Sequence, residues 1–191
     1  MEMKRKSYLI AVLILILDQA TKWLASARLD GHEAIEIIPG YLRLSFIRNS
    51  GVAFGLFTEV QSAWKPIILS LLAVAAIIVI VVYSRRMTSR RILLRVALAI
   101  IMGGILGNLA DRLVHGSVVD FIEFHVHESF YWPTFNVADS AITIGIALLL
   151  MDALRNPQGG ESRKDPVSEW ADVQSPASAR RMEDGKHESG N

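Results

Sequence analysis

The hydrophobic residues of this chain are gathered into four long runs that are separated by more polar segments. Each run has close to the roughly 20 residues that a helix needs to cross a lipid bilayer. The third run also carries Gly103 and Gly107, four residues apart, a spacing that lets membrane helices approach closely. The pattern therefore predicts an all-α membrane protein, a four-transmembrane-helix bundle with spans at about 8–24, 66–83, 92–109 and 137–154.

Basic residues predict how these spans are oriented. They lie before the first span, between the second and third, and after the fourth: Lys4, Arg5, Lys6, Arg85, Arg86, Arg90, Arg91, Arg95 and Arg155. By the positive-inside rule these segments are cytoplasmic, so both termini are cytoplasmic and residues 25–65 and 110–136 are extracytoplasmic. A cleaved signal peptide ending at Ala25-Ser26-Ala27 is the alternative for the N-terminus. Cleavage would leave three spans with basic loops on opposite sides, which the same rule disfavours.

Polar and apolar residues alternate in both extracytoplasmic segments. Residues 34–38 and 41–47 flank Pro39-Gly40 and predict a β-hairpin. After the third span, the alternation places four residues on one strand face: Val118, Asp120, Ile122 and Phe124. A small extracytoplasmic β-sheet is therefore expected beside the bundle.

Composition changes this picture only at the C-terminus. Residues 156–191 are poor in hydrophobic residues and rich in glycine, serine and charges, so they are expected to form a disordered cytoplasmic tail after a transmembrane domain of residues 1–155. The chain contains no cysteine, which excludes disulfides and a cysteine nucleophile. A net charge of +1 gives no reason to expect a nucleic-acid partner.

Strongly polar residues of the spans gather at the extracytoplasmic end, and the inner halves are expected to be dry. They are Asp18, Lys22, Asn108, Asp111, Arg112, Asn136 and Asp139. A proton or ion conduit needs polar groups along its whole depth, whereas a site that works from one face needs them at one level. This asymmetry favours an enzyme over the alternative, a small proton- or cation-binding membrane transporter or assembly factor.

Two carboxylates beside hydrocarbon, Asp120 and Asp139, suggest hydrolysis of a peptide by an aspartyl dyad. Each neighbouring polar residue also has a structural interpretation. Asn136 and Asp139 have the spacing of a helix capping box, Asp111 and Arg112 could form a surface ion pair, and Asp18 and Lys22 lie on one helix face. Asp120 has no cap to explain it and sits among apolar residues.

Other hydrolytic chemistries fit the sequence less well. His125 and His127 lie on one strand face and could bind a metal, but two solvated loop histidines are the commoner case. His127-Glu128 opens a zinc-protease motif whose second histidine would fall at Tyr131, so the motif fails. No metal or organic cofactor is expected.

Five motifs occur in one order along the chain: Asp18-Gln19-Ala20-Thr21-Lys22, Asn49-Ser50-Gly51-Val52-Ala53-Phe54-Gly55, Gly103-Gly104-Ile105-Leu106-Gly107-Asn108-Leu109-Ala110-Asp111-Arg112, Gly116-Ser117-Val118-Val119-Asp120-Phe121 and Phe135-Asn136-Val137-Ala138-Asp139. With them the chain resembles the lipoprotein signal peptidase family, also called signal peptidase II. The resemblance covers about three quarters of the chain and leaves out the tail.

The resemblance implies a multi-pass endopeptidase of the bacterial plasma (inner) membrane, with its active site at the extracytoplasmic face. Its substrate would be a prolipoprotein, cut before a cysteine that carries a diacylglyceryl group, and its other partner membrane lipid. A monomer is expected. Asp120 and Asp139 match the catalytic pair. The resemblance and the spacing together add seven residues for substrate binding or support of the site: Asn49, Asn108, Arg112, Asn136, Asp18, Lys22 and Asp111.

Overall fold

The computed structural model describes residues 2–51, 64–87, 91–127 and 129–156. Its four helices are each long and apolar enough to cross a membrane, which confirms the predicted spans. They are α1 (Glu2–Leu29), α2 (Lys65–Arg86), α3 (Ile92–His115) and α4 (Val137–Arg155). Residues up to Asp152 form one compact unit, and of the remaining unit the structure describes only residues 153–156.

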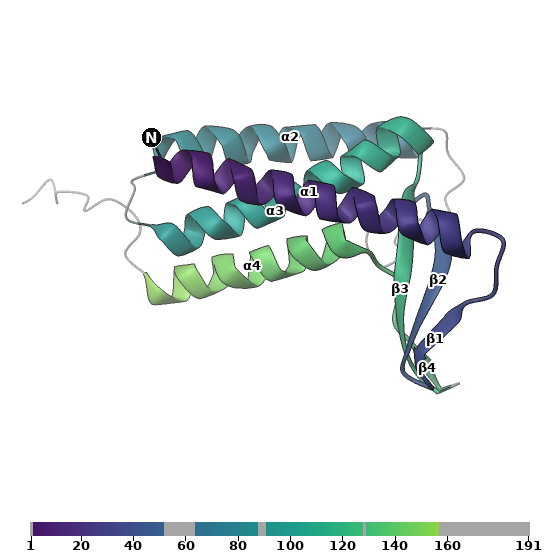
Figure 1. The fold of residues 1–191 in the computed structure, drawn as a ribbon. Helices are drawn as coiled ribbons and strands as arrows, with labels where there is room; N and C mark the ends of the chain where they lie inside the picture. Colours follow the sequence, from purple (N-terminus) through teal and green to yellow (C-terminus); the bar gives the residue numbers. More distant parts are fainter. Residues whose placement is uncertain (1, 52–63, 88–90, 128, 157–191) are drawn as a thin grey trace, which may run out of the picture. The chain divides into compact units, whose positions relative to one another are not determined.

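Helix α3 is the central helix of the bundle. In the most apolar 18-residue stretch of α3, 67% of the residues are buried, whereas none are buried in the corresponding stretch of α2. Helix α3 is therefore surrounded by protein, while α2 has only one packed side. Both α1 and α2 pack against α3 (Figure 1). The third span is therefore the one whose side chains decide how the others dock.

Glycines of α3 allow this close docking. A Cβ at Gly103 would lie 2.7 Å from the main-chain oxygen of Ala11 in α1, and one at Gly107 would overlap the carboxylate of Asp18. On another side, Gly104 faces the main-chain oxygen of Ala138 in α4. The close approach predicted from the spacing of Gly103 and Gly107 is confirmed, and α1 is the partner helix.

An antiparallel sheet of four strands lies at one end of the bundle (Figure 1). Its order is β1 (Ile35–Ile38), β2 (Leu42–Asn49), β3 (Val118–Val126), β4 (Phe130–Tyr131). The predicted hairpin is confirmed as β1 and β2. Gly40 turns the chain with φ 78°, a conformation that glycine adopts at little cost.

The sheet contacts the bundle where α1 and α3 end and α4 begins, and we call this the sheet end. Strand β3 joins the start of α4 directly, because Ile122 and Phe135 exchange main-chain hydrogen bonds of 2.9 and 3.0 Å. Ala25 and Leu29 of α1 pack against Phe121. Helix α1 is thus longer than the predicted span and continues unbroken through residues 25–27, the proposed cleavage site.

The expectation of dry inner halves is wrong at the opposite end of the bundle. Arg95 is 5% exposed and Asp152 is 3% exposed, although both lie within predicted spans. Asp152 forms an ion pair with Arg91, which compensates the cost of burying its charge. Buried charged residues therefore also occur at the end of the bundle away from the sheet.

Two expectations concern residues that lie outside the described part of the chain. The motif that begins at Asn49 continues through residues 52–55, and the expected disordered tail occupies residues 157–191. Both stay predictions.

Candidate active site

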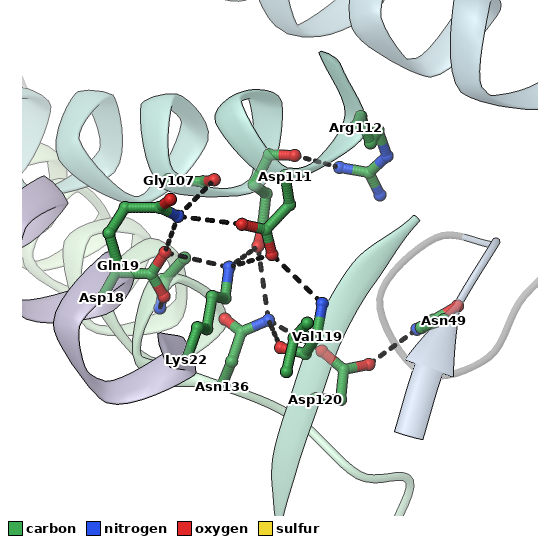
Figure 2. Close-up of polar contacts among 12 residues, drawn as sticks. Asp18, Gln19, Lys22, Asn49, Gly107, Asp111, Arg112, Val119, Asp120 and Asn136 are labelled. Carbon is green, nitrogen blue, oxygen red and sulfur yellow. Dashed lines mark hydrogen bonds and ion pairs between the residues drawn. The ribbon is translucent and has the colours of Figure 1, made fainter. Parts of the chain in front are cut away.

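Three charged side chains form a buried cluster at the sheet end. The ammonium of Lys22 lies 2.9 Å from Asp18 and 3.0 Å from Asp111, and no side chain of the three is more than 4% exposed. The same ammonium donates to Oδ1 of Asn108 at 2.9 Å. The predicted pair of Asp18 and Lys22 is confirmed, with Asp111 as a second carboxylate (Figure 2).

Each carboxylate of this cluster also binds the main chain just before another aspartate. Oδ2 of Asp111 accepts from the amide of Val119, at 3.1 Å. Oδ1 of Asp18 accepts from the amide of Ala138, at 2.8 Å. The cluster therefore fixes the backbone positions from which Asp120 and Asp139 extend.

Gln19 completes the cluster and was not singled out from the sequence. Its Nε2 donates to Asp18, to the main-chain oxygen of Gly107 and to Asp111, at 3.2, 3.2 and 2.9 Å. Gln19 stands next to Asp18 in the first motif, and three residues before Lys22, so its place on the same helix face was the available signal.

Asp120 lies on β3, 2% exposed, and both of its carboxylate oxygens accept hydrogen bonds. Asn49 donates to Oδ2 at 2.8 Å and Asn136 donates to Oδ1 at 2.7 Å. The Asn49 amide is itself oriented, since its Oδ1 accepts from the amide of Gly51 at 2.7 Å. Figure 2 shows Asn49 on its own strand, pointing toward Asp120.

The environment of Asp120 changes its acidity. Burial raises the pKa of Asp120 to about 6, and the hydrogen bond from Asn49 opposes the rise. The charge of Asp139 raises the pKa further, while the bond from Asn136 and the charge of Lys22 lower it. Asp120 and Asp139 are therefore close enough to influence each other electrostatically.

Asp139 lies in the first turn of α4. Oδ1 of Asn136 accepts from the amide of Asp139 at 2.9 Å, so the cap predicted for this helix is present. The carboxylate of Asp139 is not tied to the cap, because its Oδ1 accepts from Nδ2 of Asn108 at 2.8 Å. Capping and a role in the site are thus compatible.

Asn136 and Asn108 connect the two carboxylates. The Nδ2 group of the fully buried Asn136 donates to Asp120 at 2.7 Å and lies 3.3 Å from Oδ1 of Asn108. Asn108 in turn donates to Asp139. A continuous path of hydrogen bonds, Asp120 to Asn136 to Asn108 to Asp139, therefore crosses the site.

Arg112 does not form the ion pair with Asp111 that adjacency in the sequence suggested. Asp111 is buried against Lys22, and the Arg112 guanidinium donates to the main-chain oxygens of Asn108 and Gly51 at 3.2 and 3.0 Å. It also interacts electrostatically with Asp139 and Asp120. Adjacent residues on a helix point about 100° apart, which is why the two side chains separate.

The two histidines lie away from this network. His125 is a strand residue, 6% exposed and stacked on Tyr131, so the expectation of a solvated loop histidine is wrong for it. His127 follows β3 with φ 46° and packs edge-on against Tyr41. Burial of His125 follows from strand pairing, which the local sequence does not show.

Comparison with known proteins decides the family. The family model described as "Signal peptidase (SPase) II" matches residues 10–155, which include every residue of the site. The chain belongs to the signal peptidase II family. It is 43% identical to the lipoprotein signal peptidase of Symbiobacterium thermophilum over 145 residues, covering 76% of this chain and 91% of that protein. It is 39% identical to that of Pseudomonas aeruginosa strain UCBPP-PA14, covering 80% and 90%.

Two solved structures have a fold similar to that of this chain. One, described as a bacterial membrane enzyme studied by the in meso method at 2.3 Å resolution, has a TM-score of 0.69 and 30% identity, and covers 83% of this chain and 93% of its own. A second, of the same description at 1.9 Å, has a TM-score of 0.68 and 32% identity, with coverage of 79% and 94%. As a member of the signal peptidase II family, the chain is a bacterial membrane protease.

Proposed function

We propose that the protein is an aspartic endopeptidase that removes signal peptides from diacylglyceryl-modified prolipoproteins, cutting before the lipidated cysteine at the extracytoplasmic face of the plasma membrane. The observation that carries this proposal is the hydrogen-bonded path between Asp120 and Asp139 at the sheet end. The two relatives named above are lipoprotein signal peptidases, and their name supplies the class of substrate.

Two carboxylates that sense each other's charge cannot both ionise cheaply, so at neutral pH one carries a proton and the other is charged. The charged carboxylate takes a proton from a water as the water attacks the scissile carbonyl. The protonated one donates to the carbonyl oxygen, where negative charge develops. The tetrahedral intermediate then collapses: the C–N bond breaks, the proton taken from water passes to the leaving nitrogen, and the proton given to the carbonyl oxygen returns to its carboxylate. The amides of Asn49 and Asn136 both donate to Asp120, which suits Asp120 as the charged member of the pair.

Asp18 and Asp111 act as positioning residues in this mechanism. Each holds the amide just before one member of the pair, at Ala138 and Val119, and Lys22 lies between them. Removal of Lys22 would leave two buried carboxylates without their cation, which typically costs about 3–5 kcal/mol. The cluster therefore supports both the fold and the alignment of the pair.

Lipid-dependent recognition is the part of this proposal that a direct assay tests best. A site where four hydrophobic helices meet a sheet is open to a substrate that arrives sideways through the membrane. Acyl chains bind a substrate to the membrane by about 0.8 kcal/mol for each buried methylene, so a diacylglyceryl group keeps the cleavage site near the pair.

The assay compares two precursors of one peptide sequence, with and without the diacylglyceryl group, at equal concentration in one detergent and without any ion gradient. We expect the lipidated precursor to be cut far faster. Equal rates would leave a generic membrane aspartic protease as the better description. Failure to cut either precursor would contradict the proposed peptidase activity and favour the transporter alternative.

A further inference from the structure

A groove of about 520 Å³ lies between α2 and α3 at the sheet end. Helix α2 lines it with Ile67, Leu71 and Val74, and α3 lines it with Arg112 and Leu113. The α2 residues follow the four- and three-residue spacing of one helix face, so the groove runs along α2 for about 10 Å. It therefore has the length of the first part of an extended hydrocarbon chain.

The lining of the groove is mostly apolar, with Arg112 as its charged exception. Ser70 lies in its wall, but its hydroxyl donates to the main-chain oxygen of Pro66 at 2.6 Å within α2. Among the described residues that line the groove, the charged side chain is Arg112. A ligand that matches this lining has a long apolar body and a hydrogen-bond acceptor that can reach Arg112.

Arg112 also connects the groove with the candidate active site. The same guanidinium donates to the main-chain oxygen of Gly51 and interacts electrostatically with Asp139 and Asp120. A molecule that places its acceptor at Arg112 thus lies within electrostatic range of the two carboxylates.

We propose that this groove binds one acyl chain of the substrate's diacylglyceryl group, with the Arg112 guanidinium facing the ester oxygens. The inference rests on the proposed function and locates the lipid within it. Lipid tails are as apolar as leucine side chains, so the groove gains little hydrophobic energy over the surrounding membrane. Its contribution is alignment: a seated chain fixes the distance between the modified cysteine and the carboxylates.

A matched pair of variants in α2 tests this. Leu71→Trp fills the groove, whereas Leu72→Trp makes the same change on a residue outside the groove lining, and the wild-type leucines are similarly exposed, at 64% and 61%. Each variant is assayed in one detergent with precursors whose diacylglyceryl groups carry either long or four-carbon acyl chains. An ill-fitting group in an apolar pocket typically costs about tenfold or more in kcat/KM.

We expect Leu71→Trp to lose about tenfold in kcat/KM with the long-chain precursor and to keep its activity with the short-chain one. Leu72→Trp should cleave both like the wild type. Unchanged cleavage of the long-chain precursor by Leu71→Trp would contradict acyl-chain binding in the groove, although the peptidase activity itself would stand. If the wild type cuts neither precursor, the proposed function is wrong, and so is the assignment of a substrate acyl chain to the groove.

Cross-linking locates the bound acyl chain without requiring cleavage of the precursor. The probe is a precursor whose acyl chains carry a diazirine, bound to the Asp139→Asn variant, and the matched probe is a phospholipid with the same diazirine. We expect the precursor to label Leu71 and Leu113 more strongly than the phospholipid does. Equal labelling by both probes would show ordinary membrane lipid in the groove, and labelling on the exposed face of α1 would place the chain elsewhere.

Discussion

Asp120 and Asp139 differ in what surrounds them, although both are aspartates of one network. Asp120 lies on a strand and receives two amide donors, whereas Asp139 lies in the first turn of a helix and accepts from Asn108. Because the two carboxylates are proposed to act together in one reaction, loss of either carboxylate should abolish cleavage.

Asp120→Asn and Asp139→Asn are therefore each expected to abolish cleavage while leaving the protein folded, because an amide replaces a carboxylate of nearly equal volume. The double variant should be no worse than either single variant, since residues that act as one unit give non-additive losses. Cleavage of the lipidated precursor by purified protein measures this, with thermal melting in detergent as the control for folding. Substantial activity in one single variant would remove that residue from the mechanism.

The acidity of Asp120 gives a second prediction at the same scale. Its pKa is raised to about 6 by burial, so the folded protein holds the proton more tightly than the unfolded chain, whose aspartates titrate near 4. The stabilisation from protonated Asp120 is complete below about pH 4 and is lost as the pH rises through about 6.

The comparison is made between wild type and Asp120→Asn, which cannot ionise. The free energy of unfolding of the wild type minus that of the variant should fall by roughly 2.4 kcal/mol between pH 4 and pH 7.5. Because only the change with pH is compared, any constant effect of the amide cancels. A difference that stays flat over this range, measured by denaturation in detergent, would argue against the raised pKa.

At the scale of single residues, the sequence predicted which residues belong to the site better than it predicted which residues each of them bonds to. Asn136 was recognisable as a cap from its place before an apolar run, and that cap is present. Its second bond, to Asp120, depends on β3 lying beside the start of α4, which no local pattern shows. The hydrogen bond from Lys22 to Asn108 was also not predictable, because it joins residues that are 86 apart in the chain.

Among the elements, the docking of α1 on α3 has the narrowest tolerance, because Gly107 leaves room for the Asp18 carboxylate and for nothing larger. Gly107→Ala should push Asp18 away from Lys22 and from the amide of Ala138. Overpacking of this kind typically costs about 1–3 kcal/mol. We expect a lower melting temperature and a lower kcat.

The control is Ala75→Leu, which adds volume on the exposed side of α2. It should change neither quantity, because nothing in the bundle has to move to accommodate the larger side chain. A Gly107→Ala protein with wild-type melting and kcat would show that α1 and α3 can separate without disturbing the site.

Long apolar runs and regular alternation explain why the four helices and the hairpin were predictable. Strand β4, which has two residues, was not predicted, because its only regular structure is its pairing with β3. The inner ends of the spans were predicted to be dry because Arg95 was counted only for orientation and Asp152 was not considered. The structure pairs Arg91 with Asp152, a contact between helices that neither sequence segment shows alone.

For the molecule as a whole, the arginines predict its direction in the membrane. Single cysteines introduced at Ser89 and Ser178 should react with an impermeant reagent only from the cytoplasm, and one at Ser62 only from outside. The native chain has no cysteine to interfere. Labelling of Ser178→Cys from outside intact cells would overturn both the four-span orientation and the cytoplasmic tail.

The buried cluster of Asp18 and Lys22 also constrains how the chain is assembled during synthesis. Helix α1 leaves the ribosome long before Asn108 and Asp111, and at about 5–20 residues per second the interval lasts several seconds. Until α3 arrives, Asp18 and Lys22 can pair only with each other, because Asn108 and Asp111 are not yet in place. Helix α2, which has no buried residue, does not replace α3 as a packing partner for these side chains. The hydrogen bonds and ion pairs of this pair are therefore completed only when the third helix packs against the first.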